Sequence, residues 1–127
     1  MLPIADNLLI ADADLRGWAN LPPGPCNVLL VGGHFAAIGQ HLDIAGAQVI
    51  DGRGCWLTPG LVDLCAAGRE PGQEQDEDLA SLSRCAAAGG YVAVAVGPDT
   101  QPSNDDHAVT ELIVRRARDI GLCDLVP

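Results

Sequence analysis

Cysteine and histidine side chains, the usual ligands of protein-bound zinc, do not form a familiar ligand pattern in this chain. The five cysteines have an odd count, and no two of them are spaced as C-x-x-C. This spacing argues against a disulfide framework and against a structural zinc site. We therefore expect a cytoplasmic protein with reduced cysteines, which are Cys26, Cys55, Cys65, Cys85 and Cys123.

The three histidines are not placed to act together. His34 and His41 fall in a segment of short predicted strands, and His107 falls near the start of a predicted helix, where we expect it to face solvent. Because none of them has a second histidine at ligand spacing, we expect no metal-binding or catalytic role for any of the three.

Two linked motifs carry a family resemblance. The run Pro59–Gly72 reads PGLVDLCAAGREPG and resembles the first barrel strand of cyclic amidohydrolases, above all dihydroorotase, where the pattern is P-G-x-x-D-x-H-x-H-x-R-x-P-G. The run Gly97–Asp105 reads GPDTQPSND and is similar to that family's loop after the second strand, M-P-N-T-x-P-x-N-D. The β-rich segment before Pro59 also fits. The resemblance thus covers essentially the whole chain and implies the N-terminal portion of such a protein.

The resemblance implies hydrolysis of a cyclic amide C–N bond by a zinc-activated hydroxide, with the two first-strand histidines as ligands. In this chain the first histidine position is Cys65 and the second is Ala67. Alanine cannot bind a metal, and one thiolate does not replace two imidazoles. We expect degenerate metal positions, no bound metal, no catalytic residue, and a small buried thiol at Cys65.

Arg69 favours dihydroorotases over allantoinases and hydantoinases, which usually lack an arginine there. The resemblance implies that this arginine and the loop asparagine hold the substrate carboxylate, a task that suits a guanidinium because it can donate two parallel hydrogen bonds. Here the asparagine position is Asp99, which repels an anion. Arg69 therefore fits equally a vestigial substrate-binding site and a structural ion pair with Asp99 or Glu70.

The first 57 residues predict short strands separated by turns. Gly32-Gly33 is typical of a hairpin, because both glycines tolerate a positive φ. The predicted strands are 7–10, 27–31, 34–38, 48–50 and 55–57.

Beyond Pro59 the pattern becomes strand, helix, strand, helix, strand, which is typical of parallel βα units. The strands are expected at 60–64, 91–96 and 122–126. One helix is expected at 77–88, and a second is expected after a cap at Asn104 or Asp105, with Val109, Leu112, Ile113 and Ile120 on its apolar face. The predicted fold class is α/β: a partial β-sandwich at 1–57, then at 58–127 the first two and a half βα units of an amidohydrolase (β/α)₈ barrel.

The net charge of −10 and the pI near 4.3 exclude the usual nucleic-acid binders and binders of anionic membrane surfaces. The first residues lack the basic segment of a signal peptide, and no apolar run is long enough to span a bilayer.

Our leading hypothesis is a non-catalytic dihydroorotase homologue of pyrimidine biosynthesis. The resemblance implies a role as an assembly partner of aspartate carbamoyltransferase. One alternative is a metal-dependent cyclic amidohydrolase completed by sequence not present here. The other is a truncated gene product without stable function. Because an incomplete barrel exposes apolar strands, we expect the chain to associate, with a partner or with the rest of a longer amidohydrolase chain.

Overall fold

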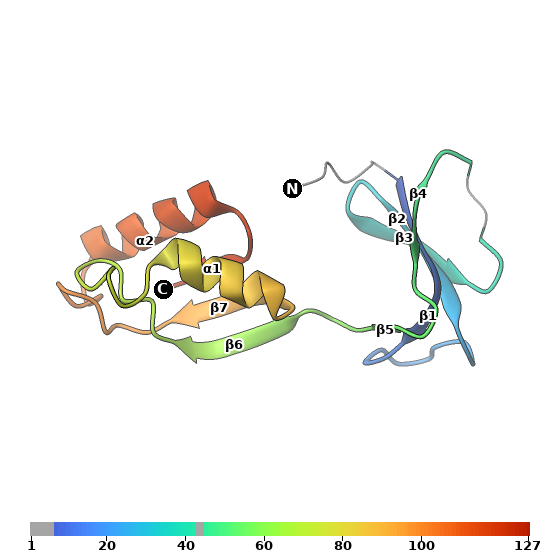
Figure 1. Ribbon diagram of the computed structural model, residues 1–127, viewed down its shortest axis with the longest axis horizontal. Helices are drawn as coiled ribbons and strands as arrows, with labels where there is room; N and C mark the ends of the chain where they lie inside the picture. The colour runs from blue at the N-terminus through green and yellow to red at the C-terminus, as the bar shows by residue number, and fades with distance from the viewer. Residues whose placement is uncertain (1–6, 43–44) are drawn as a thin grey trace. The chain divides into compact units, whose positions relative to one another are not determined.

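The computed structural model describes residues 7–42 and 45–127, so residues 1–6 and 43–44 of the predicted first module lie outside the described part. The chain divides into two compact units, Met1–Pro59 and Gly60–Pro127 (Figure 1). Each unit is built from local elements that the residue pattern explains.

The described residues of unit 1 form a five-stranded sheet with the order β3-β2-β1-β4, in which β5 also pairs with β1. The central strand β1 is antiparallel to β2 and parallel to both β4 and β5. The strands are β1 (Asn7–Leu15), β2 (Cys26–Val31), β3 (His34–Gly39), β4 (Gln48–Asp51) and β5 (Trp56–Leu57).

Strand β1 runs five residues beyond its predicted end at Ile10. Its register against β2 shifts between Ile10 and Ala13, and Asp12 takes a left-handed φ of 56° at that bulge. The Asp12 N–H donates to the Asn27 side-chain oxygen over 2.9 Å. A β-bulge absorbs an extra residue without ending the strand. The polar residues after Ile10 predicted a strand end at that point, whereas the bulge lets β1 continue past them.

The Gly32-Gly33 hairpin is confirmed, with φ values of 56° and 79°. Strands β1 and β2 form a small core of Leu15, Cys26 and Val28, against which side chains of the loop between these two strands pack. In that loop Trp18 contacts the Phe35 ring edge-on, with 6.3 Å between the ring centroids.

Unit 2 confirms the alternation of strands and helices. Its three strands are parallel and adjacent in the order β6-β7-β8, and both helices pack together on one face of the sheet (Figure 1). The elements are β6 (Leu61–Ala66), α1 (Leu79–Ala88), β7 (Tyr91–Val96), α2 (His107–Ile120) and β8 (Asp124–Val126). The identity of the two units as parts of a sandwich and of a closed barrel stays a prediction.

Helix α2 corrects two details of its predicted pattern. Its N-cap is Asp106, whose carboxylate accepts hydrogen bonds from the N–H groups of Ala108 and Val109; the expected caps lie one or two residues too early. Its buried residues recur every four positions, at Val109, Ile113 and Ala117, so Leu112 is 41% exposed instead of buried. A helix that rests on a sheet buries a narrow stripe, and Leu112 lies at the border of that stripe.

The face of the unit 2 sheet opposite the helices carries apolar side chains that remain exposed. Val62 pairs with Ala93 and Val126 pairs with Ala95, so these residues share that face, and both valines are exposed. Leu64, on β6, is 82% exposed. Among the described residues, no helix is both long and apolar enough to cross a membrane.

Candidate functional site

The two positions where the resemblance places metal-binding histidines lie at the carboxyl end of β6. Cys65 is in the strand, and Ala67 is the first residue after it. Both side chains are exposed, so the expected burial of the Cys65 thiol is wrong. The reason is local: the register of β6 against β7 is irregular between Asp63 and Ala66, and the Cys65 N–H bonds to the Asp63 carboxylate over 2.9 Å.

The histidines are exposed and scattered. His34 begins β3 and His41 follows it, whereas His107 is the first residue of α2. The predicted solvent exposure of His107 is confirmed, because its side chain is 93% exposed. Within the described ranges, no three His, Cys, Asp or Glu side chains come together in a way that could hold a metal ion.

Arg69 follows β6 in the loop that leads to α1. Its backbone has a left-handed φ of 54°, and its Nη1 donates to the Gln73 side-chain oxygen over 3.0 Å. The expected ion pair with Asp99 or Glu70 is wrong, since no carboxylate of the described residues lies within ion-pair distance of this guanidinium. Asp99 is exposed in its own loop, and Glu70 is bound elsewhere.

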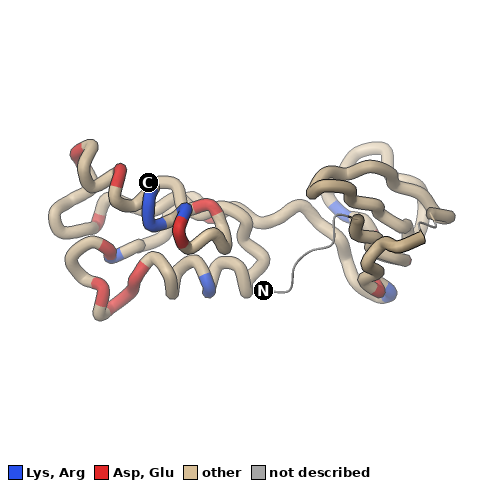
Figure 2. Tube along the Cα trace, turned by 90° about the horizontal axis from the view of Figure 1, so that it is seen from above, with Lys and Arg blue, Asp and Glu red and all other residues tan. Residues whose placement is uncertain are grey.

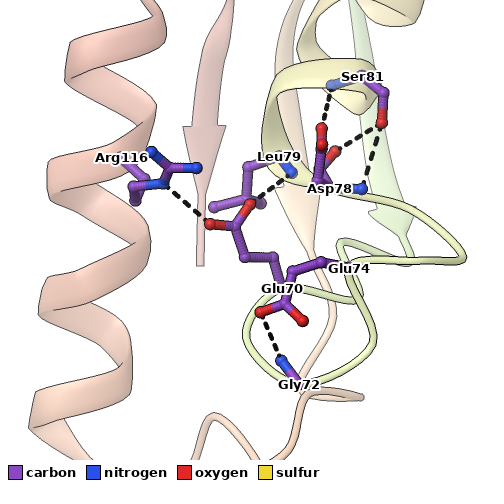
Figure 3. Close-up of polar contacts among 7 residues, drawn as sticks. All are labelled: Glu70, Gly72, Glu74, Asp78, Leu79, Ser81 and Arg116. Carbon is purple, nitrogen blue, oxygen red and sulfur yellow. Dashed lines mark hydrogen bonds and ion pairs between the residues drawn. The ribbon is translucent and has the colours of Figure 1, made fainter.

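Glu70 is the side chain at this site whose role the residue pattern did not reveal. Its Oε2 accepts the N–H of Leu79, the first residue of α1, over 2.9 Å (Figure 3). Its Oε1 accepts Nε–H of Arg116, on α2, also over 2.9 Å. The residue is only 7% exposed, so both oxygens need partners, and a helix N-terminus and a guanidinium are suitable ones.

The second motif forms a loop that is held from within. The Pro98 carbonyl accepts hydrogen bonds from the N–H groups of Thr100 and Asn104 and from the Ser103 hydroxyl. Thr100 is buried, and its hydroxyl donates to the Pro102 carbonyl over 2.7 Å. The loop after β7 is therefore ordered by its own polar groups, and Asp99 lies exposed on it.

The two motif loops lie against each other. The Gln101 N–H donates to the Pro71 carbonyl over 2.8 Å, and the Gly97 N–H donates to the Ala66 carbonyl over 2.9 Å. Both loops follow the carboxyl ends of parallel strands, which is where α/β proteins bind ligands. The structure thus brings the backbones of the two motif segments into contact, which their separation in the sequence did not predict.

These loops are strongly acidic. In Figure 2 the acidic segments of this unit, coloured red, lie mostly along its loops. Backbone N–H donation stabilises two of the carboxylates: the Ser81 N–H lowers the pKa of Asp78, and the Gly72 N–H lowers the pKa of Glu74 (Figure 3). Both groups are therefore ionised at neutral pH, and the negative field that they create opposes anionic ligands.

The chain matches dihydroorotases in sequence, although no family model matches it. It is 43% identical over 125 residues to the dihydroorotase of Anaeromyxobacter dehalogenans strain 2CP-C, which covers 98% of this chain and 29% of that protein. The dihydroorotase of Pelobacter propionicus is 39% identical over 102 residues, covering 80% of this chain and 24% of that protein. The chain thus spans about a quarter of the length of these relatives.

Two hydantoinase structures have a similar fold. A D-hydantoinase superposes with a TM-score of 0.68 at 23% identity, covering 92% of this chain and 25% of that chain. The L-hydantoinase from Arthrobacter aurescens superposes with a TM-score of 0.71 at 19% identity, covering 93% and 26%. The chain is therefore dihydroorotase-like in sequence over most of its length, and its fold matches about a quarter of a hydantoinase chain.

Proposed function

We propose that this chain is a dihydroorotase-like protein that does not itself hydrolyse a cyclic amide. The observation that carries the proposal is Ala67, which occupies a histidine position of the matched motif and has no atom that could bind a metal. Its neighbour on the motif, Cys65, offers one thiol. The residues present at the end of β6 therefore do not fit the zinc site of the family.

Ring opening of a cyclic amide needs a nucleophile that these residues do not generate. Opening a cyclic amide at neutral pH requires hydroxide, and the family generates it by lowering the pKa of metal-bound water. A single exposed thiolate neither fixes a coordination geometry nor places a water opposite a carbonyl. We therefore assign no catalytic step to Cys65 or Ala67.

Arg69 gives the site its remaining chemistry. Gln73 occupies Nη1, and no carboxylate of the described part neutralises the guanidinium, so the group is available to a small carboxylate. This supports a vestigial substrate-binding function at Arg69 and Asp99, in which Asp99 weakens the binding of any anion. The ligand class would be the one that the relatives' name implies, a dihydroorotate-like carboxylate.

We propose further that the chain acts by association, as a cytoplasmic, non-catalytic partner of aspartate carbamoyltransferase in pyrimidine biosynthesis. The support is the sequence similarity to dihydroorotases together with the exposed apolar side chains Val62 and Leu64 on the unit 2 sheet. Co-expression followed by size-exclusion chromatography tests this part of the proposal. Separate elution of the two proteins at micromolar concentrations would contradict the partnership.

The inactivity is tested by metal analysis and by assay of the same preparation. The chain is purified in the presence of zinc, dialysed, analysed for metal, and incubated with dihydroorotate. We expect less than one tightly bound zinc ion per chain and no turnover. The double variant Cys65→His, Ala67→His, at the same length, is expected to stay inactive. Metal-dependent turnover by the unmodified chain would overturn the proposal.

A further inference from the structure

The buried carboxylate of Glu70 connects three parts of unit 2. It belongs to the loop after β6, and its two oxygens accept hydrogen bonds from the first N–H of α1 and from Arg116 on α2 (Figure 3). Within the described part of the chain it is the only charged residue that is buried. A buried charge is costly unless it is paired. The ion pair between Glu70 and Arg116 therefore fixes this loop against α2.

Arg69 directly precedes this anchor, and its backbone is held on both sides. The Glu70 N–H donates to the Gly68 carbonyl over 2.7 Å, and the Gln73 N–H donates to the Arg69 carbonyl over 2.9 Å. With a φ of 54° at Arg69, the direction in which its side chain leaves the loop depends on how the next residue is held. Because an L-residue rarely adopts this φ freely, the surroundings must impose it.

The Arg69 guanidinium keeps one edge available. Gln73 accepts from Nη1, whereas Nε and Nη2 have no hydrogen-bond partner among the described residues. These two nitrogens form the edge that can donate two parallel hydrogen bonds to a carboxylate. The affinity of this edge for a carboxylate depends on its orientation, because a displaced guanidinium loses one of the two hydrogen bonds.

We propose that Glu70 is a positioning residue for Arg69. By binding α1 and α2 at once, Glu70 holds the loop in the backbone conformation that presents the free edge of the Arg69 guanidinium to a small carboxylate ligand. The inference rests on the proposed vestigial carboxylate site. It goes beyond that site by assigning its geometry to a residue that touches no ligand, and to an ion pair between residues 46 positions apart.

A purely structural role for Glu70 predicts a different result. If the carboxylate only holds the helices, its loss lowers stability and leaves the ligand affinity and the Arg69 side-chain signal unchanged at temperatures well below unfolding. The variants Glu70→Gln and Arg116→Gln each remove the charge pair. Arg115→Gln is the matched control, because Arg115 is the neighbouring arginine and pairs with the exposed Glu111 on the same helix.

The experiment uses the whole 127-residue chain, labelled with ¹⁵N, and follows the Arg69 Nε–Hε resonance during titration with dihydroorotate. Arg69→Gln identifies the resonance, and circular dichroism checks that each variant is folded. We expect dihydroorotate to shift this resonance in the unmodified chain. We expect Glu70→Gln and Arg116→Gln to weaken binding about ten-fold. Arg115→Gln should bind like the unmodified chain. If Glu70→Gln does not fold, Arg116→Gln, in which the altered side chain is half-exposed, decides the question.

The two hypotheses fail in different ways. If the unmodified chain does not bind dihydroorotate, the proposal of a vestigial site is wrong. The positioning role is then judged from the Arg69 resonance of the ligand-free proteins. A displaced or broadened Arg69 resonance in Arg116→Gln, with an unchanged one in Arg115→Gln, still supports the positioning role. Equal affinity of the folded Glu70→Gln or Arg116→Gln variant and the unmodified chain overturns it, as does an Arg69 resonance that neither variant alters.

Discussion

Gly72 and Gln101, one from each motif loop, approach so closely that no side chain fits between them. A β-carbon built on Gly72 would lie 2.3 Å from the Gln101 carbonyl oxygen and 2.6 Å from its Cβ. Gly72 also has a φ of 106°, which L-residues rarely adopt. The two motif loops can therefore approach this closely only because position 72 is a glycine.

We predict that Gly72→Ala destabilises the chain by about 3 kcal/mol, because the added methyl group combines a strained φ with an overpacked contact. Gly90→Ala is the matched control: its φ of 83° is equally left-handed, but a Cβ there meets nothing within 4 Å. We expect that control to cost about 1 kcal/mol. Urea denaturation measures both, and equal losses would show that the contact contributes nothing.

The N-cap of α2 gives a second prediction. Asp106→Ala should lower the free energy of unfolding by about 1 kcal/mol, because two backbone N–H groups lose their acceptor. Asp105→Ala removes an equal charge one residue earlier and should change stability by less than about 0.5 kcal/mol. Thermal melts of the two variants decide between them. A larger loss of stability in Asp105→Ala would show that Asp105, one of the two caps predicted from the sequence, is the N-cap.

Much of unit 2 could be predicted because its signals are local. Strand β7 occurs at its predicted residues, since a continuous apolar run is bounded by glycines at Gly90 and Gly97. The cap of α2 was misplaced because Asn104, Asp105 and Asp106 are all good caps, and only the fold shows that the Asn104 side chain instead accepts a hydrogen bond from Thr110.

The site was less predictable because its decisive contacts are not local. Glu70 and Arg116 are 46 residues apart, and nothing in the spacing links them. The exposure of Cys65 depends on an irregular register between two strands, which a sequence pattern does not encode. The resemblance identified the positions Cys65 and Ala67, whereas their surroundings required the structure.

Thiol accessibility provides a third prediction. Cys55, Cys65 and Cys85 are exposed, whereas Cys26 and Cys123 are buried. A thiol reagent such as Ellman's reagent should therefore label three cysteines quickly in the native chain and the last two only after unfolding. Cys65→Ala should reduce the rapid phase by one thiol, and Cys26→Ala should leave it unchanged. A rapid phase that Cys65→Ala does not alter would mean that this thiol is covered in solution.

The cap of α1 gives a pH-dependent prediction. Hydrogen bonds from Ser81 lower the pKa of Asp78 below its ordinary value of 3.8 in the folded chain. A lowered folded pKa means that the stabilisation is complete above the unfolded value and is lost as pH falls through the folded value. Asp78→Asn keeps an acceptor but has no such titration. The stability difference between the two proteins should therefore be constant from pH 7 to 5 and should change below about pH 4. A difference that stays constant down to pH 3 would contradict the shift.

The last prediction concerns the exposed face of the unit 2 sheet. Leu64 is 82% exposed there, and Val62 and Val126 add apolar surface, so this face should associate at high concentration. Light scattering after size exclusion should show a mass that rises with concentration. Leu64→Lys should lower that mass toward the monomer, because a desolvated ammonium group opposes burial of this face. Leu112→Lys adds the same charge at a partly exposed position on α2 and should not lower it. Each lysine brings the net charge of −10 closer to zero and weakens self-repulsion, so net charge alone would raise association in both variants. An equal reduction in both variants would therefore show that association does not depend specifically on the Leu64 face. A mass that stays monomeric at every concentration would show that this apolar face does not drive self-association.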